Sequence, residues 1–201
     1  MELSQLAGKQ VETLRAISNI GMDHAAAALS QLLQRNINLK APRILTIADG
    51  QLPIPGGVKP SVIGVCLCMQ GDARGKIVIV FSRESALNML DNLLSREESG
   101  TGSLTELESS ALMEVGNILA SSFLNALGGR LRITLVPSVP ALLSDIAGTV
   151  AELARTVPAG DEILPLLMET EFFDDHSGFS GHFLLLPDHA SIDLFLGKTG
   201  A

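Results

Sequence analysis

Three polar residues in the second half of the chain have types and spacing suited to chemistry: Ser110, Glu114 and Asn117. They stand at i, i+4 and i+7, so on a helix they share one face. Glu114 would supply a fixed negative charge, and the Asn117 carboxamide donates and accepts hydrogen bonds, so it can hold a water molecule. Neither side chain is a nucleophile in this setting. The pair suits positioning chemistry on another molecule, although an ordinary solvated helix face is the alternative.

A long helix must carry these residues. Ser103 followed by Glu106 fits a capping box, and Gly128-Gly129 fits a left-handed stop, which together predict a helix over about 104–127. The polar trio is expected on a face separate from an apolar stripe. That stripe consists of Leu107, Ala111, Val115, Ile118, Leu119 and Leu124.

The chain also repeats itself. The segment from Asn19 matches the segment from Asn117, and in each copy a proline follows 23 residues later, at Pro42 and Pro140. Each half reads as a long helix, strands and a short helix, with the first long helix expected over about 5–34. Matching apolar runs predict strands that begin at Arg43, Ser61, Lys76, Arg132, Glu162 and His182, and short helices over 82–94 and 188–197.

These elements predict an α/β (α+β) fold whose two halves are related by a pseudo-twofold axis. We expect a single domain over 1–201, with a first half of 1–100 and a second half of 101–201. A merged core is favoured over two independent domains because each half is short and its helix stripe needs cover.

Composition limits the functions open to this fold. Hydrophobic residues make up 46% and charged residues 18%, which is typical of a globular protein. The chain has no Trp or Tyr and a formal net charge of -8, so nucleic acid is not an expected partner. It has neither a secretory signal pattern nor an apolar run near the ~20 residues of a spanning helix. We therefore expect a cytoplasmic protein with no membrane insertion.

Two other groups of residues invite a metal interpretation. Cys66 and Cys68 lie two apart in an expected strand and are interpreted as small core residues. His176 and His182 flank a Gly-rich turn near two aspartates, but their spacing matches no standard ligand set, so a turn is expected there. The acidic second half, with 13 Asp and Glu against 4 Lys and Arg, indicates either solubility or a surface that steers a basic partner.

The motif Ser-x3-Glu-x2-Asn, followed by Pro140, resembles the signature of the CheC/CheX/FliY family. Members of this family are phosphatases of phosphorylated CheY, the chemotaxis response regulator. The first copy, NIGMDHAAAALSQLL from Asn19, is similar to the CheC pattern. The resemblance covers nearly the whole chain and includes the duplication. A CheC-like member is expected, without a flagellar-switch extension of the FliY kind.

The family's functional positions carry over differently to the two halves. In the second half, Glu114 and Asn117 occupy the catalytic positions, and Ser110 and Pro140 match the rest of the motif. The resemblance therefore implies a complete site in this half.

In the first half, Asn19 and Pro42 match the motif, but Ala16 stands where the glutamate belongs and Glu12 where the serine belongs. The resemblance therefore implies a degenerate first-half site. The chain as a whole is expected to be a single-site member.

The resemblance also implies a mechanism. The receiver domain carries the aspartyl phosphate, a Mg²⁺ ion and a lysine, and positioning and electrostatics dominate phosphoryl transfer. Asn117 would orient the attacking water, and Glu114 would pair with the receiver's lysine. Because the metal belongs to the partner, no cofactor is expected in this chain. The alternatives are a non-catalytic module that sequesters the receptor deamidase CheD, or one that only binds phosphorylated CheY.

Overall fold

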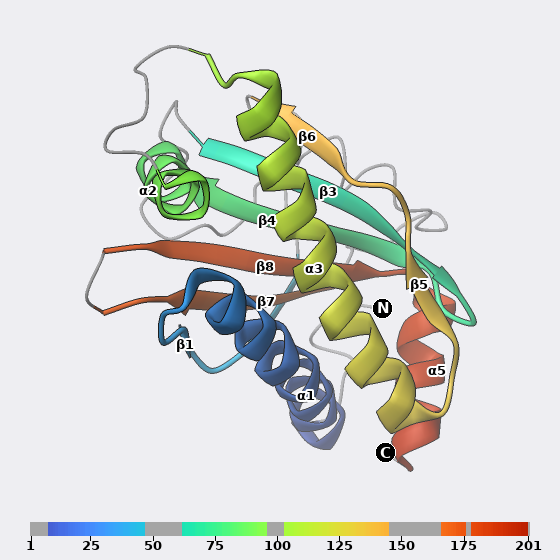
Figure 1. The fold of residues 1–201 in the computed structure, drawn as a ribbon. Coiled ribbons are helices and arrows are strands. Elements are labelled where there is room, and N and C mark those ends of the chain that lie inside the picture. The colour runs from blue at the N-terminus through green and yellow to red at the C-terminus, as the bar shows by residue number, and fades with distance from the viewer. Residues whose placement is uncertain (1–7, 47–61, 96–102, 145–165, 176–177, 201) are drawn as a thin grey trace.

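The computed structural model describes residues 8–46, 62–95, 103–144, 166–175 and 178–200. In these segments four helices lie over one antiparallel sheet, which confirms the expected fold class (Figure 1). The helices are α1 (Gly8–Leu33), α2 (Arg83–Leu94), α3 (Glu106–Leu131) and α5 (His189–Thr199). The strands are β1 (Asn38–Leu39), β2 (Arg43–Thr46), β3 (Val62–Gly71), β4 (Gly75–Ser82), β5 (Leu135–Pro137), β6 (Ala141–Ser144), β7 (Leu166–Phe173) and β8 (Ser180–Pro187).

The sheet interleaves strands from both halves of the sequence. Its order is β1-β7-β8-β4-β3-β5, with β2 also on β7 and β6 also on β3. The first-half strands β1 and β2 thus pair with second-half β7, and second-half β5 and β6 pair in the same way with first-half β3. Strands β4 and β8 meet at the centre. Neither half has a sheet of its own, so the halves share one core. The boundary at 100/101 stays a prediction, because it lies outside the described residues.

Side-chain alternation along β3 divides the sheet into two faces. Ile63, Val65 and Leu67 join the main core under the helices, whereas Cys66 packs against a smaller apolar cluster on the other face. Cys66 and Cys68 do share a face, but both are partly exposed free thiols. Their interpretation as core residues is wrong to that extent, because the main core lies on the opposite face. Burial raises the pKa of the Cys66 thiol, which keeps it protonated.

Helices α1 and α3 lie side by side across one face of the sheet (Figure 1). Gly21 of α1 makes room for the ring of Phe123 of α3, which is fully buried and stacks on Phe183 with 4.7 Å between ring centroids. Gly116 allows α3 to approach Val65 of β3, since a Cβ atom at Gly116 would overlap that valine. The residue after Gly116 is Asn117, so this close contact seats the turn of α3 that carries Asn117 on the sheet.

The ends of α3 differ from the prediction. The N-cap is Thr105 rather than Ser103, and Thr105 forms the capping box with Glu108: the Glu108 N–H donates to Thr105 Oγ1 at 3.2 Å, and the Thr105 N–H donates to Glu108 Oε2 at 2.7 Å. Gly128 remains helical, and the helix ends at Leu131 with Arg132 in the left-handed region. Gly128 instead allows close approach to the backbone carbonyl of Ile133.

The other expected elements are present with small shifts in their ends. The helix α2 is capped by Ser82 and α5 by Asp188, each at the start of its predicted segment. The sequence analysis missed the short strands β1 and β6. Among the described residues, no helix is long and apolar enough to cross a bilayer.

Candidate active site

The outward face of α3 holds the three residues that the motif singled out. Ser110 and Glu114 are exposed and Asn117 is half-buried. Because α3 is a continuous helix from Glu106 to Leu131, the predicted spacing places all three on one face. Glu114 and Asn117 are one turn apart on a helix that is packed firmly against α1 and β3. The carboxylate and the carboxamide are thus presented from a rigid support.

Apolar side chains surround Glu114 on this face, which corrects the predicted separation of polar and apolar faces. Val115, Leu119 and Leu124 are buried as expected, but the other three members of the stripe keep part of their surface exposed. Leu107 is 57% exposed, and Ala111 and Ile118 are half-buried. On a helix these three stand at i−7, i−3 and i+4 relative to Glu114.

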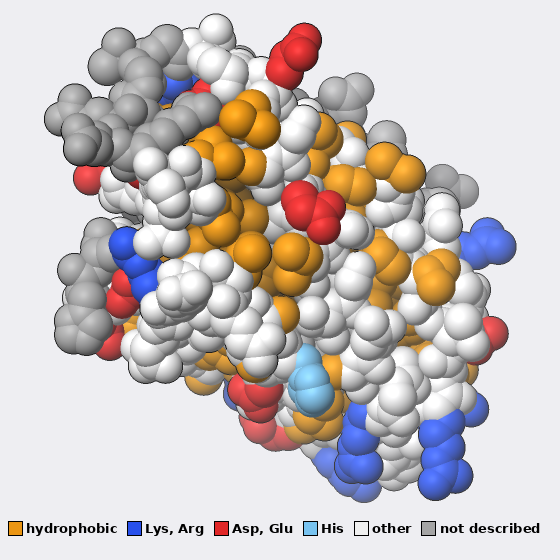
Figure 2. All heavy atoms as spheres, in the orientation of Figure 1, with side chains coloured by type: hydrophobic (Ala, Val, Ile, Leu, Met, Phe, Trp, Pro, Cys, Tyr) orange, Lys and Arg blue, Asp and Glu red, His pale blue; other side chains and the backbone are white. Residues whose placement is uncertain are grey.

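Figure 2 shows hydrophobic side chains gathered over the middle of this side of the molecule, with acidic side chains among them. Exposed apolar surface rimmed by polar groups is typical of an interaction site. The prediction that the whole stripe is buried is wrong, because helical periodicity does not say how wide a strip of α3 the sheet and α1 cover.

Asn117 has a side-chain partner that the sequence analysis missed. The hydroxyl of Ser121, one turn further along α3, donates to Asn117 Oδ1 at 3.5 Å. The i+4 spacing was visible in the sequence, but a serine on a helix face carries no signal of its own.

Pro140 is not on α3 but in the connection between β5 and β6, and it is half-buried. The connection is fastened to β3 through one residue: Cys68 N–H donates to Ser138 Oγ, and Ser138 N–H donates to the Cys68 carbonyl, each at 2.9 Å. A proline has no N–H to donate, which suits the short gap between two strands that pair with β3 in succession. Its role here is in the strand connection. The adjacent Val139 is 86% exposed.

The corresponding turn of α1 offers different chemistry. Asn19 and Ala16 are both exposed, so a methyl group stands where the second half has a carboxylate. Glu12 is held by Arg15, whose Nη1 lies 2.7 Å from Glu12 Oε1. Arg15 of this ion pair is a cation next to Ala16, the position that lacks the carboxylate. Pro42 is buried directly before β2.

The metal interpretation finds no support in the described segments, where no three His, Cys, Asp or Glu side chains come together as a metal site would need. The two aspartates before the Gly-rich turn instead bond to the connection after α1 and to β1. Asp174 pairs with Arg35 at 3.5 Å, and Asp175 accepts from Asn38 Nδ2 at 2.9 Å. His176 lies outside the described residues.

His182 belongs to an ion-pair cluster on the sheet face opposite the helices. The buried Glu169 of β7 has both oxygens engaged: Oε1 lies 2.8 Å from His182 Nδ1, and Arg43 Nε donates to Oε2 at 2.6 Å. Burial alone would raise the pKa of Glu169. The hydrogen bonds from His182 and Arg43, together with their charges, outweigh burial and hold the pKa below its ordinary value. The cluster ties β2, β7 and β8 together.

This cluster predicts acid sensitivity of the fold. Because the pKa of Glu169 is lowered in the folded state, the unfolded chain binds more protons as the pH falls below the ordinary value of 4.5. Stability is therefore present above that pH and is lost as the pH falls through the lowered pKa. Glu169→Gln should flatten this part of the pH dependence. Urea unfolding of both proteins between about pH 3 and 6 measures it, and equal slopes would contradict the assignment.

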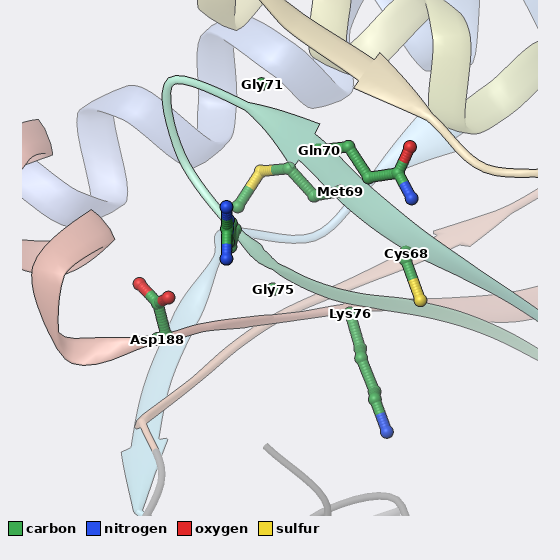
Figure 3. Close-up of a pocket in the computed structure, with 8 residues that line it drawn as sticks. Cys68, Met69, Gln70, Gly71, Gly75, Lys76 and Asp188 are labelled. Carbon is green, nitrogen blue, oxygen red and sulfur yellow. The ribbon is translucent and has the colours of Figure 1, made fainter. Parts of the chain in front are cut away.

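A cavity of about 450 Å³ lies at the β3–β4 hairpin and is separate from the α3 face. Its described lining comes from both strands of the hairpin and from Asp188, with no residue from α3. Figure 3 shows the side chains of Cys68 and Lys76 on one side of the hairpin, with Asp188 at the start of α5. Asp188 is already engaged as the cap of α5, accepting from Ser191 N–H at 2.8 Å. The α3 face thus remains the candidate site.

An α+β fold of two interleaved halves, with a Glu–Asn pair on one long helix, defines a class of proteins already represented by known sequences. The model of the CheC-like family matches residues 107–144, a stretch that includes Ser110, Glu114, Asn117 and Pro140. The protein named CheY-P phosphatase CheC from Bacillus subtilis is 31% identical over 96% of this chain and 95% of its own length. This chain belongs to the CheC-like family, which confirms the predicted resemblance.

Solved structures show the same fold at lower sequence identity. Thermotoga maritima FliY is 19% identical and superimposes with a TM-score of 0.72, covering 98% of each chain. CheX in the CheX–CheY–BeF3–Mg²⁺ complex from Borrelia burgdorferi is 18% identical with a TM-score of 0.63, over 85% of this chain and 97% of that chain. The matches support the interleaved architecture and, at this identity, the fold alone.

Proposed function

We propose that this chain is a phosphatase that hydrolyses the aspartyl phosphate of a CheY-type receiver domain, using a single site on α3. The observation that carries the proposal is the exposed Glu114 beside Asn117, one turn apart on a rigid helix with apolar neighbours. The Bacillus subtilis relative, named as a CheY-P phosphatase, matches nearly the whole chain and supports the same activity. The CheX–CheY complex supports a receiver domain as the partner.

The site is a helix face, so the reaction is expected to take place in the partner's phosphorylation site. Docking would carry the Asn117 carboxamide to the aspartyl phosphate, where it holds a water in line with the phosphorus. Because the water is already held in position, its attack on the phosphorus becomes an effectively unimolecular step of the docked complex. The receiver's own Mg²⁺ would neutralise charge that develops on the phosphoryl oxygens. This chain then needs no cofactor of its own.

Glu114 would fix the register of docking. Its carboxylate is exposed and has the apolar side chains of Leu107, Ala111 and Ile118 around it. An ion pair with the receiver's lysine would form within this apolar rim, which limits its contact with water and salt. The apolar rim supplies contact area, and the charge selects the orientation in which Asn117 reaches the phosphate.

The apolar rim leads to a prediction for Leu107→Asp. A second carboxylate at this 57% exposed position should place an unpaired charge in the docked interface. KM for phosphorylated CheY is expected to rise about tenfold or more, the equivalent of about 1.4 kcal/mol, while kcat at saturation stays the same. Steady-state kinetics measure both. Ala27→Asp, which adds the same charge at an exposed position of α1 outside the motif, is the matched control and should leave KM unchanged.

Turnover tests the proposed activity itself. Phosphorylated CheY is mixed with a small fraction of this protein, and inorganic phosphate is followed with time. Release of many phosphates per chain, faster than spontaneous decay, is the expected result. No acceleration with any receiver domain of the source organism would contradict the proposal.

The alternative is a binding module without catalysis, directed at CheD or at phosphorylated CheY. The observation in its favour is Ala16, which shows that one half of this fold has no glutamate at the motif position. A complex with CheD or with phosphorylated CheY, in the absence of any turnover, would favour this alternative.

A further inference from the structure

Ser121 directs its hydroxyl to a side chain of its own helix rather than to a backbone carbonyl. A serine or threonine inside a helix commonly donates to the backbone carbonyl four residues earlier. Thr13 of α1 does so to Lys9 at 2.9 Å, and Thr199 of α5 does so to Phe195 at 3.1 Å. The Ser121 hydroxyl instead donates to the side-chain Oδ1 of Asn117, at 3.5 Å. The recipient is the carboxamide that the proposed mechanism requires.

The contact gives the Asn117 amide a direction. The terminal torsion of an asparagine side chain is broad, so a partly exposed carboxamide turns readily. Donation from Ser121 holds Oδ1 toward the next turn of α3 and uses one of its two lone pairs. The second lone pair and both N–H groups remain for a water molecule. Both residues are half-buried, which shields the contact in part from competing solvent.

We propose that Ser121 is a positioning residue for the dephosphorylation: it orients the Asn117 carboxamide toward the attacking water and does not itself touch the phosphate. The inference rests on the proposed phosphatase function. It assigns Ser121 an effect on the chemical step and none on docking, because Glu114 and the apolar rim around it hold the receiver.

The expected result is a loss in kcat alone. At 3.5 Å the contact from Ser121 to Asn117 is a long hydrogen bond, whose contribution lies at the low end for side-chain pairs, so Ser121→Ala should lower kcat about threefold at saturating phosphorylated CheY. KM and the Kd for beryllofluoride-activated CheY should stay as in the wild type. Ser121→Thr keeps the hydroxyl and should keep the wild-type kcat. Ser121→Val has nearly the same shape as the threonine variant but no hydroxyl, and its kcat should fall as in Ser121→Ala. Ser122→Ala, on the neighbouring residue, is the control.

A double substitution separates positioning from a structural role. In the Asn117→Ala background there is no carboxamide to orient, so adding Ser121→Ala should cause no further loss of kcat. A further loss equal to that of the single variant would overturn the inference. A wild-type kcat in Ser121→Ala, together with an inactive Asn117→Ala, would also overturn the inference. This result would leave the proposed function standing. If Asn117→Ala itself keeps wild-type activity, the proposed function fails and the role of Ser121 fails with it.

Discussion

Asn117→Ala is expected to lower kcat for receiver dephosphorylation about 100-fold, which corresponds to about 2.7 kcal/mol of barrier. The substitution removes the carboxamide and leaves α3, its cap and its packing on β3 in place. Glu114 and Leu107 remain to hold the receiver, so KM should change little. A loss in kcat without a loss in binding is the signature of an interaction made in the transition state. Rapid-mixing measurements of phosphorylated CheY decay over a range of concentrations separate the two constants.

Asn125→Ala provides the matched control for this prediction. Asn125 is an exposed asparagine on the same helix, about two turns beyond Asn117. Its substitution tests whether any asparagine on α3 affects the rate through helix stability or surface charge. Activity of Asn117→Ala within about threefold of the wild type would be too small an effect for a water-orienting residue and would contradict the assigned role.

Glu114→Arg is expected to lower kcat/KM by a comparable factor, mainly by weakening the binding of the receiver and not by lowering kcat. Reversing this charge would set a cation against the receiver's lysine in a partly desolvated interface, and like charges in such a position cost several kcal/mol. We expect kcat/KM to fall about 100-fold or more, mostly through weaker binding. Isothermal titration with beryllofluoride-activated CheY measures the affinity, and the same decay assay measures kcat/KM.

Asp23→Arg is the control for the change in net charge. Asp23 is exposed on α1 and lies outside the proposed site. A charge exchange tests the pairing directly: a receiver in which the lysine of the phosphorylation site is replaced by glutamate should bind Glu114→Arg better than it binds the wild type. Equal loss of binding in Glu114→Arg and Asp23→Arg would show that net charge, and not a specific ion pair, governs the association.

The duplication explains how the fold presents one complete copy of the motif and one incomplete copy. Helices α1 and α3 are equivalent in the two halves and lie next to one another on the sheet (Figure 1). The framework that presents Asn117 therefore also presents Asn19 at the surface. What differs is local chemistry, with a methyl group at Ala16 and the Glu12–Arg15 ion pair where α3 has a carboxylate and an apolar rim.

The long helices and the polar trio could be predicted from sequence because both depend on helical period within one segment. The ends of α3 could not, since Ser103 and Thr105 are both acceptable N-caps by type and the less favoured threonine is used. Gly128 stays helical and lies against the carbonyl of Ile133, a contact that the sequence does not show. The short strands β1 and β6 carry too few residues for a periodic signal. Each forms because a long strand of the other half offers an edge to pair with.

The apolar rim and Ser121 were missed at the site for related reasons. Leu107, Ala111 and Ile118 have the period of a core stripe, and only the packed structure shows that the sheet and α1 cover a narrower strip of α3. A serine side chain such as that of Ser121 is common on any solvated helix face. Its relation to Asn117 depends on the direction of the hydroxyl, which the sequence does not encode in an obvious pattern.

The most direct test of a single site on α3 compares the two equivalent asparagines. The decay of phosphorylated CheY is measured with the wild type, with Asn117→Ala and with Asn19→Ala at equal protein concentrations. With a single site on α3, the acceleration is lost in Asn117→Ala and fully kept in Asn19→Ala. Acceleration that survives in Asn117→Ala and disappears in Asn19→Ala would place the active site on α1 and contradict the account.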